Sequence, residues 1–268
     1  MDINEKKKEI LQKKEYNADD LVTIVEILRA PGGCPWDREQ THRSIRSDLI
    51  EETYEVIEAI DKGDVALLRE ELGDVLLQIA MHAEMEREAG RFDFDDVAND
   101  ICKKMIHRHP HVFADVQAET SAEVLRNWES IKSEEKKRES ITDKLNAIPR
   151  QFPALMRAVK VGKKAAALDF PDVESVACKV EEELAEVREA VRAGEQAHIE
   201  EEIGDLLLAV ASLSRKCHVN AEEALVRAVD KFILRFSRVE AAAEAAGLHL
   251  GEMSDAELDI LWQKVKEI

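Results

Sequence analysis

The chain has 268 residues, of which 45% are apolar and 4% aromatic, and its net charge is −19. This composition permits a buried core and favours helices over strands, while the acidic balance argues against a nucleic acid as the main partner. The four cysteines are widely spaced, and no apolar stretch reaches the ~18 residues that a membrane span requires. We therefore expect an all-α protein that works in the cytoplasm with reduced thiols, without a membrane partner.

Helical periodicity and helix breakers predict a first series of elements. A charged extension over 1–14 begins the chain, either as an additional helix or as a frayed tail. Pro110 is expected to end one helix just after Arg108, because proline cannot continue it. Helices are expected at 18–30, 38–62, 65–89, 95–108 and 121–138.

The same series recurs after a polar segment that contains Pro149 and Pro153. In this second series, helices are expected at 153–168, 172–193, 196–218, 221–240 and 255–267. We interpret the chain as two tandem helical domains, each with a core of the four-helix-bundle type that a dimer completes. The expected divisions are an extension at 1–14, a first domain at 15–135, a linker at 136–150 and a second domain at 151–268.

Aligned motifs support this duplication. The acidic pattern of Glu51, Glu52 and Glu55 recurs 131 residues later as Glu182, Glu183 and Glu186. Two capping boxes also correspond, each starting eight residues before a tryptophan. They are Thr120 with Glu123 and Ser254 with Glu257.

The spacing of the acids about a glycine turn predicts that they meet. Glu55 lies eight residues before Gly63 and Glu71 lies eight after it, so antiparallel helices would bring the two to the same level. Gly194 divides the second series in the same way. Gathered carboxylates repel unless a cation neutralises them, and oxygen ligands suit Mg²⁺, with Mn²⁺ as an alternative. The expected metal ligands are Glu52, Glu55, Glu71 and Asp74 in the first copy and Glu183, Glu186, Glu202 and Asp205 in the second. The four acids of the second copy would also act in catalysis through the bound metal.

Two other interpretations compete with a metal site of this kind. The acids could form only a solvated surface, as in a non-catalytic acidic scaffold or a regulatory nucleotide-binding protein. Two Glu-x-x-His motifs, Glu39 with His42 and Glu195 with His198, raise a di-iron bundle, but they stand at non-equivalent places in the two copies. Gly73 and Gly204, inside the acidic motifs, suggest either a tight helix approach or room for a ligand.

Basic and aromatic residues at helical spacing form the expected substrate-binding set. Pairs one turn apart could hold a polyphosphate, and a tryptophan offers a flat surface to a base. In the second copy these residues are Lys231, Arg235, Trp262 and Lys266, and in the first copy Lys104, Arg108, Trp128 and Lys132.

The sequence resembles the MazG family of nucleoside triphosphate pyrophosphohydrolases over nearly its whole length. The motifs that carry the resemblance include GCPWDREQTH (33–42), LIEETYEVIEAI (49–60), LREELGDVLLQI (68–79) and RHPHVFAD (108–115). The resemblance implies an all-α homodimer that depends on Mg²⁺ and cleaves nucleoside triphosphates to monophosphates and pyrophosphate. It also implies metal-ligand roles for the eight acids given above, and nucleotide-contacting roles for Lys231, Arg235, Trp262 and Lys266 of the second copy. The chain departs from the family at LDFPD (168–172), where a tryptophan is usual.

Two further expectations follow. Base specificity should be broad, as in housekeeping of nucleotide pools, because a tryptophan stacks on any base. The second copy should carry most of the turnover, because its basic pair, Lys231 and Arg235, is expected within a long helix. In the first copy Pro110 ends the helix just after Arg108, which gives that basic pair a less rigid support.

Overall fold

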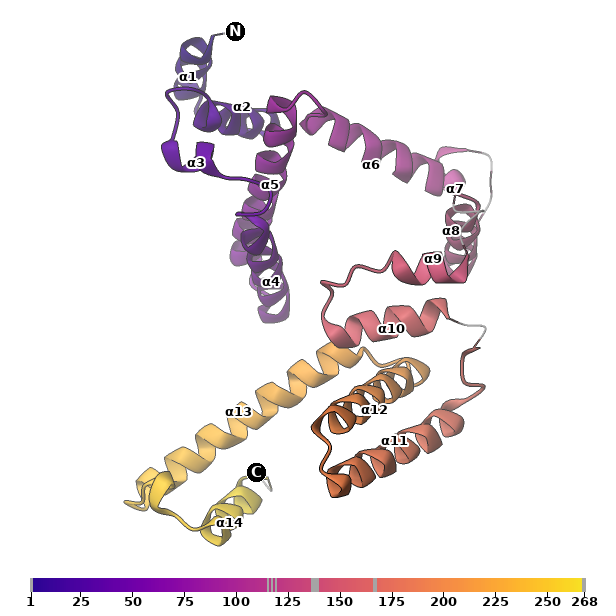
Figure 1. The fold of residues 1–268 in the computed structure, drawn as a ribbon. Helices are drawn as coiled ribbons and strands as arrows, with labels where there is room; N and C mark the ends of the chain where they lie inside the picture. The colour runs from indigo at the N-terminus through magenta and orange to yellow at the C-terminus, as the bar shows by residue number, and fades with distance from the viewer. Residues whose placement is uncertain are drawn as a thin grey trace. The chain divides into compact units, whose positions relative to one another are not determined.

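The computed structural model describes residues 2–114, 116, 118, 120–135, 140–165 and 168–266. Throughout these ranges the regular structure is helical, without strands, which confirms the all-α prediction (Figure 1). The chain divides into two compact units, residues 1–135 and 136–268. The finer domain bounds expected from the sequence stay a prediction.

The first unit is a series of helices that begins with a short charged one. Asp2 and Glu5 form a capping box at its start, so the N-terminal extension is helical. The helices are α1 (Ile3–Gln12), α2 (Ala18–Arg29), α3 (Pro35–Glu39), α4 (Arg46–Lys62), α5 (Val65–Glu88), α6 (Phe94–Arg108), α7 (Pro110–Phe113) and α8 (Ser121–Glu135).

The second unit repeats the main features of the first. Its helices are α9 (Ile141–Asn146), α10 (Ala154–Lys164), α11 (Val173–Ala193), α12 (Gln196–Lys216), α13 (Ala221–Ala245), the 3₁₀ turn η2 (Leu250–Glu252) and α14 (Asp255–Lys266).

Each unit is built on one helical hairpin, α4 with α5 and α11 with α12. Gly63 and Gly194 end the first helix of each hairpin in the left-handed conformation, with φ of 66° and 76°. Glycine adopts this conformation without a Cβ penalty, so the turn is tight. Asp64 then caps α5 by accepting hydrogen bonds from the backbone of Ala66 and Leu67.

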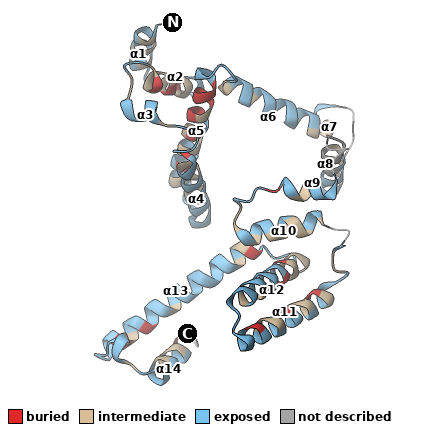
Figure 2. Cartoon of the chain, in the orientation of Figure 1, coloured by how far each residue is buried: buried red, intermediate tan, exposed pale blue. Residues whose placement is uncertain are grey.

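The core of the first unit lies where α2 crosses α5. Val25, Ile45, Ala80, Met81 and Met85 form one buried cluster there, and Figure 2 shows most of the buried residues of α5 gathered near its end next to α2. Elsewhere on both hairpins most residues are exposed or half-buried (Figure 2). Burial is therefore concentrated at one end of the first hairpin.

Some expected helix bounds were wrong. The helix predicted at 38–62 begins only at Arg46, because Thr41 and Ser44 turn the chain before it. The Thr41 N–H donates to Ser44 Oγ over 2.9 Å and the Ser44 N–H to Thr41 Oγ1 over 3.2 Å. The segment expected to serve as a linker contains the short helix α9, which Ser140 caps, and its role as a linker stays a prediction. The helix expected to reach residue 168 ends at Lys164.

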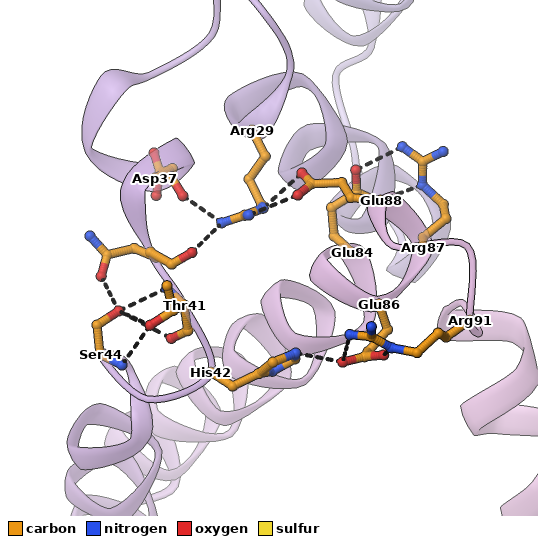
Figure 3. A network of polar contacts seen from close by, with 11 residues as sticks. Arg29, Asp37, Thr41, His42, Ser44, Glu84, Glu86, Arg87, Glu88 and Arg91 are labelled. Carbon is orange, nitrogen blue, oxygen red and sulfur yellow. Dashed lines mark hydrogen bonds and ion pairs between the residues drawn. The ribbon is translucent and has the colours of Figure 1, made fainter.

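Arg29, the last residue of α2, ties α3 to the end of α5. Its guanidinium donates from Nε and Nη2 to the two carboxylate oxygens of Glu88, each over 2.9 Å, and from Nη1 to the Asp37 carbonyl over 2.6 Å (Figure 3). The Arg29 side chain is only 6% exposed. A bidentate pair of this kind fixes orientation as well as distance, so the GCPWD segment has a defined position.

None of the described helices combines the length and the apolar character that crossing a bilayer requires.

Candidate functional site

Three carboxylates of the first hairpin converge between its two helices. Glu52 and Glu55 lie one turn apart on α4, and Glu71 faces them from α5. Each residue offers an oxygen that lies within 4.8 Å of the others. Glu71 is buried and the other two are half-buried. We call these three residues the first acid cluster.

The second hairpin repeats this arrangement with Glu183, Glu186 and Glu202, whose oxygens also lie within 4.8 Å of one another. Here Glu183 is the buried member, only 6% exposed. We call these three residues the second acid cluster. The equal spacing of the acids about each turn glycine is what brings them together, because an antiparallel hairpin pairs residues at equal distance from its turn.

The two aspartates that complete the expected ligand sets lie outside these clusters. Asp74 is half-buried, and its charge helps to raise the pKa of Glu52 and Glu71. Asp205 is exposed. Their assignment as ligands stays a prediction, as does the metal-binding role of the six glutamates.

Burial and mutual repulsion shape the electrostatics of both clusters. Burial raises the pKa of Glu52, and the nearby Glu55 and Asp74 add to the effect. Burial and Glu55 likewise raise the pKa of Glu71, and burial and Glu183 raise that of Glu186. In each cluster, burial and the neighbouring acids thus make the ionised carboxylates less favourable. A hard divalent cation bound by their oxygens would relieve this repulsion. The donor set fits Mg²⁺ or Mn²⁺.

The raised pKa values predict a pH-dependent response to metal. A carboxyl group whose pKa is higher in the folded than in the unfolded state contributes unfavourably to stability once pH rises above the folded pKa. At lower pH, protons relieve the repulsion and compete with the cation. We therefore expect the rise in melting temperature on adding Mg²⁺ to be larger at about pH 7.5 than at about pH 5.5. Calorimetry with Mg²⁺ or with EDTA at both pH values checks this, and equal increments would contradict it.

Gly73 and Gly204 do not mark a tight helix approach within the described parts of the chain. A Cβ built at either position meets no heavy atom within 4 Å. The alternative, room for a ligand, remains.

This open space gives a stability prediction for Gly204→Ala. Alanine is the better helix former by about 1 kcal/mol, and nothing in the described structure opposes the added methyl group. The free energy of unfolding of the variant should therefore be higher by about 1 kcal/mol. This appears as a urea midpoint at higher concentration. A loss of stability would instead indicate that something outside the chain packs on this face of α12.

The basic and aromatic residues of the second copy lie on α13 and α14. Trp262 packs on Phe232 with ring centroids 5.2 Å apart, and both line an apolar groove of ≈ 410 Å³ with Phe236 and Val239. Lys231 and Lys266 are exposed and Arg235 is half-buried. Among the described residues, no ion pair joins any of these three cations to the second acid cluster.

The matching residues of the first copy have different neighbours. Trp128 packs edge-on against His109, with centroids 5.1 Å apart. Lys104 is exposed and Arg108 is the last residue of α6, with Pro110 beginning α7, as expected. The side chain of Lys132 lies outside the described residues.

Several polar contacts were not foreseen from the sequence. Lys179 on α11 contacts the second acid cluster at Glu183, and its spacing of four residues was the available signal. His42 stacks on His82, and its Nε2 lies 2.6 Å from Glu86. The Arg91 guanidinium and then His42 lower the pKa of Glu86 to about 2 (Figure 3).

These contacts bear on the di-iron alternative. His42 faces His82 and Glu86 near the end of α5, whereas His198 contacts Glu201 and Glu202 on its own helix. The two Glu-x-x-His motifs thus have unlike surroundings, which does not favour a symmetric di-iron site.

Comparison with known proteins gives consistent matches. A family model described as the MazG nucleotide pyrophosphohydrolase domain matches the chain twice, over residues 40–113 and 171–239. A nucleoside triphosphate pyrophosphohydrolase of Escherichia coli (strain K12) is 46% identical over 255 residues, covering 92% of this chain and 96% of the relative. The nucleoside triphosphate pyrophosphohydrolase/pyrophosphatase MazG of Thermotoga maritima is 43% identical over 92% of this chain and 95% of its own length. A nucleoside triphosphate pyrophosphohydrolase of Mycobacterium tuberculosis is 35% identical over 88% of this chain and 62% of its own length.

Proposed function

The chain belongs to the MazG family of nucleotide pyrophosphohydrolases, and we propose that it hydrolyses nucleoside triphosphates to nucleoside monophosphates and pyrophosphate, with Mg²⁺ as its cofactor. The names of the relatives support the substrate class. The observation that carries the proposal is the convergence of three carboxylates in each hairpin. The net charge of −19 argues against nucleic acid as the substrate.

The residues of the second copy have distinct roles in this proposal. Glu183, Glu186 and Glu202 hold the cation between α11 and α12, with Asp205 at the edge of the site. A divalent cation, when bound, lowers the pKa of a water and neutralises phosphate charge. Lys231 and Arg235, one turn apart on α13, hold the β and γ phosphates. The protein thus acts by positioning and by electrostatics.

A second copy of the chain is expected to complete the site. Apolar side chains at helical spacing are left in water on α13, where Leu225, Val229 and Ile233 are between 48% and 59% exposed. Such a stripe marks an interaction surface. A symmetric dimer could cover this stripe and bring a basic pair to the acids.

Light scattering tests this assembly directly. At micromolar concentration we expect twice the chain mass of 30.3 kDa. A monomeric mass under the same conditions would remove the dimer from the proposal.

Base specificity is proposed to be broad. The groove beside Trp262 is lined mainly by apolar and aromatic side chains, which contact any base through its face. Discrimination of ~100-fold between bases requires ~2.7 kcal/mol of differential contact, and among the described residues that line this groove the charged ones are Asp255 and Asp259. Broad specificity suits a housekeeping role in the cytoplasm. A preference above ~100-fold for one base in a panel of triphosphates would refute it.

Product analysis tests the reaction itself. The full chain is incubated with each nucleoside triphosphate and Mg²⁺, and the products are separated by chromatography. We expect equal amounts of monophosphate and pyrophosphate, and no product when EDTA replaces Mg²⁺. Release of diphosphate and orthophosphate would overturn the proposed reaction, and no product with any triphosphate would favour the scaffold alternative.

A further inference from the structure

The two acid clusters have equivalent carboxylates but unequal counter-charge. Lys179 lies on α11 one turn before Glu183, and its Nζ is 2.7 Å from an oxygen of Glu182 and 2.7 Å from an oxygen of Glu183. The Lys179 side chain is 34% exposed and the Glu183 side chain is 8% exposed. The ammonium group therefore reaches inward to the most buried member of the second acid cluster.

The facing helix contributes a second polar contact to the same cluster. His198 on α12 lies one turn before Glu202, and its Nδ1 is 3.4 Å from a Glu202 oxygen. Each helix of the second hairpin thus supplies a nitrogen to a carboxylate of the cluster.

The first acid cluster lacks both of these groups. At the repeat offset of 131 residues, Asp48 stands where the second copy has Lys179, and Leu67 stands where it has His198. Within the part of the chain that the structure describes, no ion pair reaches Glu52, Glu55 or Glu71. Asp48 adds negative charge one turn before Glu52, where the second copy has a positive charge.

We propose that Lys179 is an internal counterion that weakens cation binding at the second acid cluster, so that the two clusters have different affinities for a divalent metal. This rests on the proposed metal-dependent function. A metal entering the second cluster meets a positive charge already paired with Glu183, whereas no such ion pair occupies the first cluster among the described residues. The first cluster then holds a cation on its own, and the second takes its cation together with the negative charge of a nucleotide.

A positive charge as close to the second acid cluster as Lys179 substantially lowers the affinity of the cluster for a cation. Two unit charges ~4 Å apart near a protein surface interact strongly enough to change a binding constant by about tenfold or more. Lys179 is thus a positioning residue in this scheme, since it acts through Glu183.

Metal titration of the full chain without nucleotide tests the inference. The probe is Mn²⁺, whose free concentration is measured by electron paramagnetic resonance. We expect two classes of site that differ about tenfold or more in dissociation constant. Glu52→Gln should remove the tight class, and Glu183→Gln should remove the weak class.

Charge variants then identify the cause. Lys179→Ala should tighten the weak class about tenfold and leave the tight class unchanged, while Asp48→Lys should weaken the tight class by a similar factor. Arg192→Ala is the matched control, because it removes the same charge from the same helix nine residues beyond Glu183. It should change neither class by more than about twofold, since screening by salt reduces the effect of distant exposed charges.

The outcomes separate this inference from the proposed function. Two classes of equal affinity, or a weak class that Lys179→Ala does not change, would overturn the inference even if the protein hydrolyses triphosphates. Failure to bind Mn²⁺ at all would overturn the proposed metal dependence as well. Circular dichroism verifies the fold of each variant, and Asp48→Lys provides an independent result should Lys179→Ala not fold.

Discussion

Glu183→Ala is expected to lower pyrophosphate release by about 100-fold or more, whereas Glu52→Ala is expected to retain most of the activity. Both substitutions remove one carboxylate from an acid cluster that the other copy repeats. The difference arises because the second copy is proposed to carry most of the turnover.

The helices that carry the two basic pairs support this assignment. Lys231 and Arg235 lie in the middle of α13, which runs from Ala221 to Ala245. Arg108 is the last residue of α6, and the chain leaves that helix at His109. A clamp within a continuous helix has its geometry fixed on both sides, whereas one at a helix end frays.

The measurement is a steady-state assay of pyrophosphate release under saturating Mg²⁺. Each variant is first shown to be folded by circular dichroism, and the ratio of kcat/KM values gives the lost stabilisation of the transition state. Loss of activity in Glu52→Ala with near wild-type activity in Glu183→Ala would reverse the assignment. Similar losses in both variants would show that the two copies act together.

Gly33→Ala is expected to destabilise the first unit by about 3 kcal/mol. A Cβ at this position would lie 2.3 Å from the backbone oxygens of both Ile27 and Leu28. The neighbours are backbone atoms at the end of α2, and the Leu28 oxygen accepts a hydrogen bond of 2.8 Å from the Cys34 N–H. The loop can accept a methyl group only by breaking this turn and moving the segment that Arg29 holds.

Gly32→Ala is the matched control, because Gly32 is adjacent and a Cβ there meets no heavy atom within 4 Å. Its φ of 83° still favours glycine, so this variant should lose only about 1 kcal/mol. Urea denaturation should be analysed with a separate transition allowed for each unit. Equal losses in the two variants would contradict the steric explanation for Gly33.

Local and periodic features of this protein could be predicted from the sequence. The capping boxes form as expected: the Glu123 N–H donates to Thr120 Oγ1 over 3.3 Å and the Glu257 N–H to Ser254 Oγ over 3.4 Å. Both turn glycines adopt the left-handed conformation. These features depend on residues within a few positions of each other, so the local sequence specifies them.

The convergence of the acid clusters was also predictable. An antiparallel hairpin with a tight turn has a register set by chain geometry, so equal spacing about Gly63 or Gly194 fixes which residues face each other. The all-α class and the tandem arrangement follow from the same periodicity, and both are confirmed.

Only the tertiary structure decided which groups surround the acids and how tightly the helices approach. Gly73 was consistent with close packing, yet the structure leaves open space beside it. Trp262 was a candidate to face a base, and the fold packs its ring on Phe232. Lys179 turns toward Glu183 rather than into solvent. A helical pattern fixes the face on which a side chain lies but not its rotamer or its neighbours from other helices, and these depend on the packing of the whole unit.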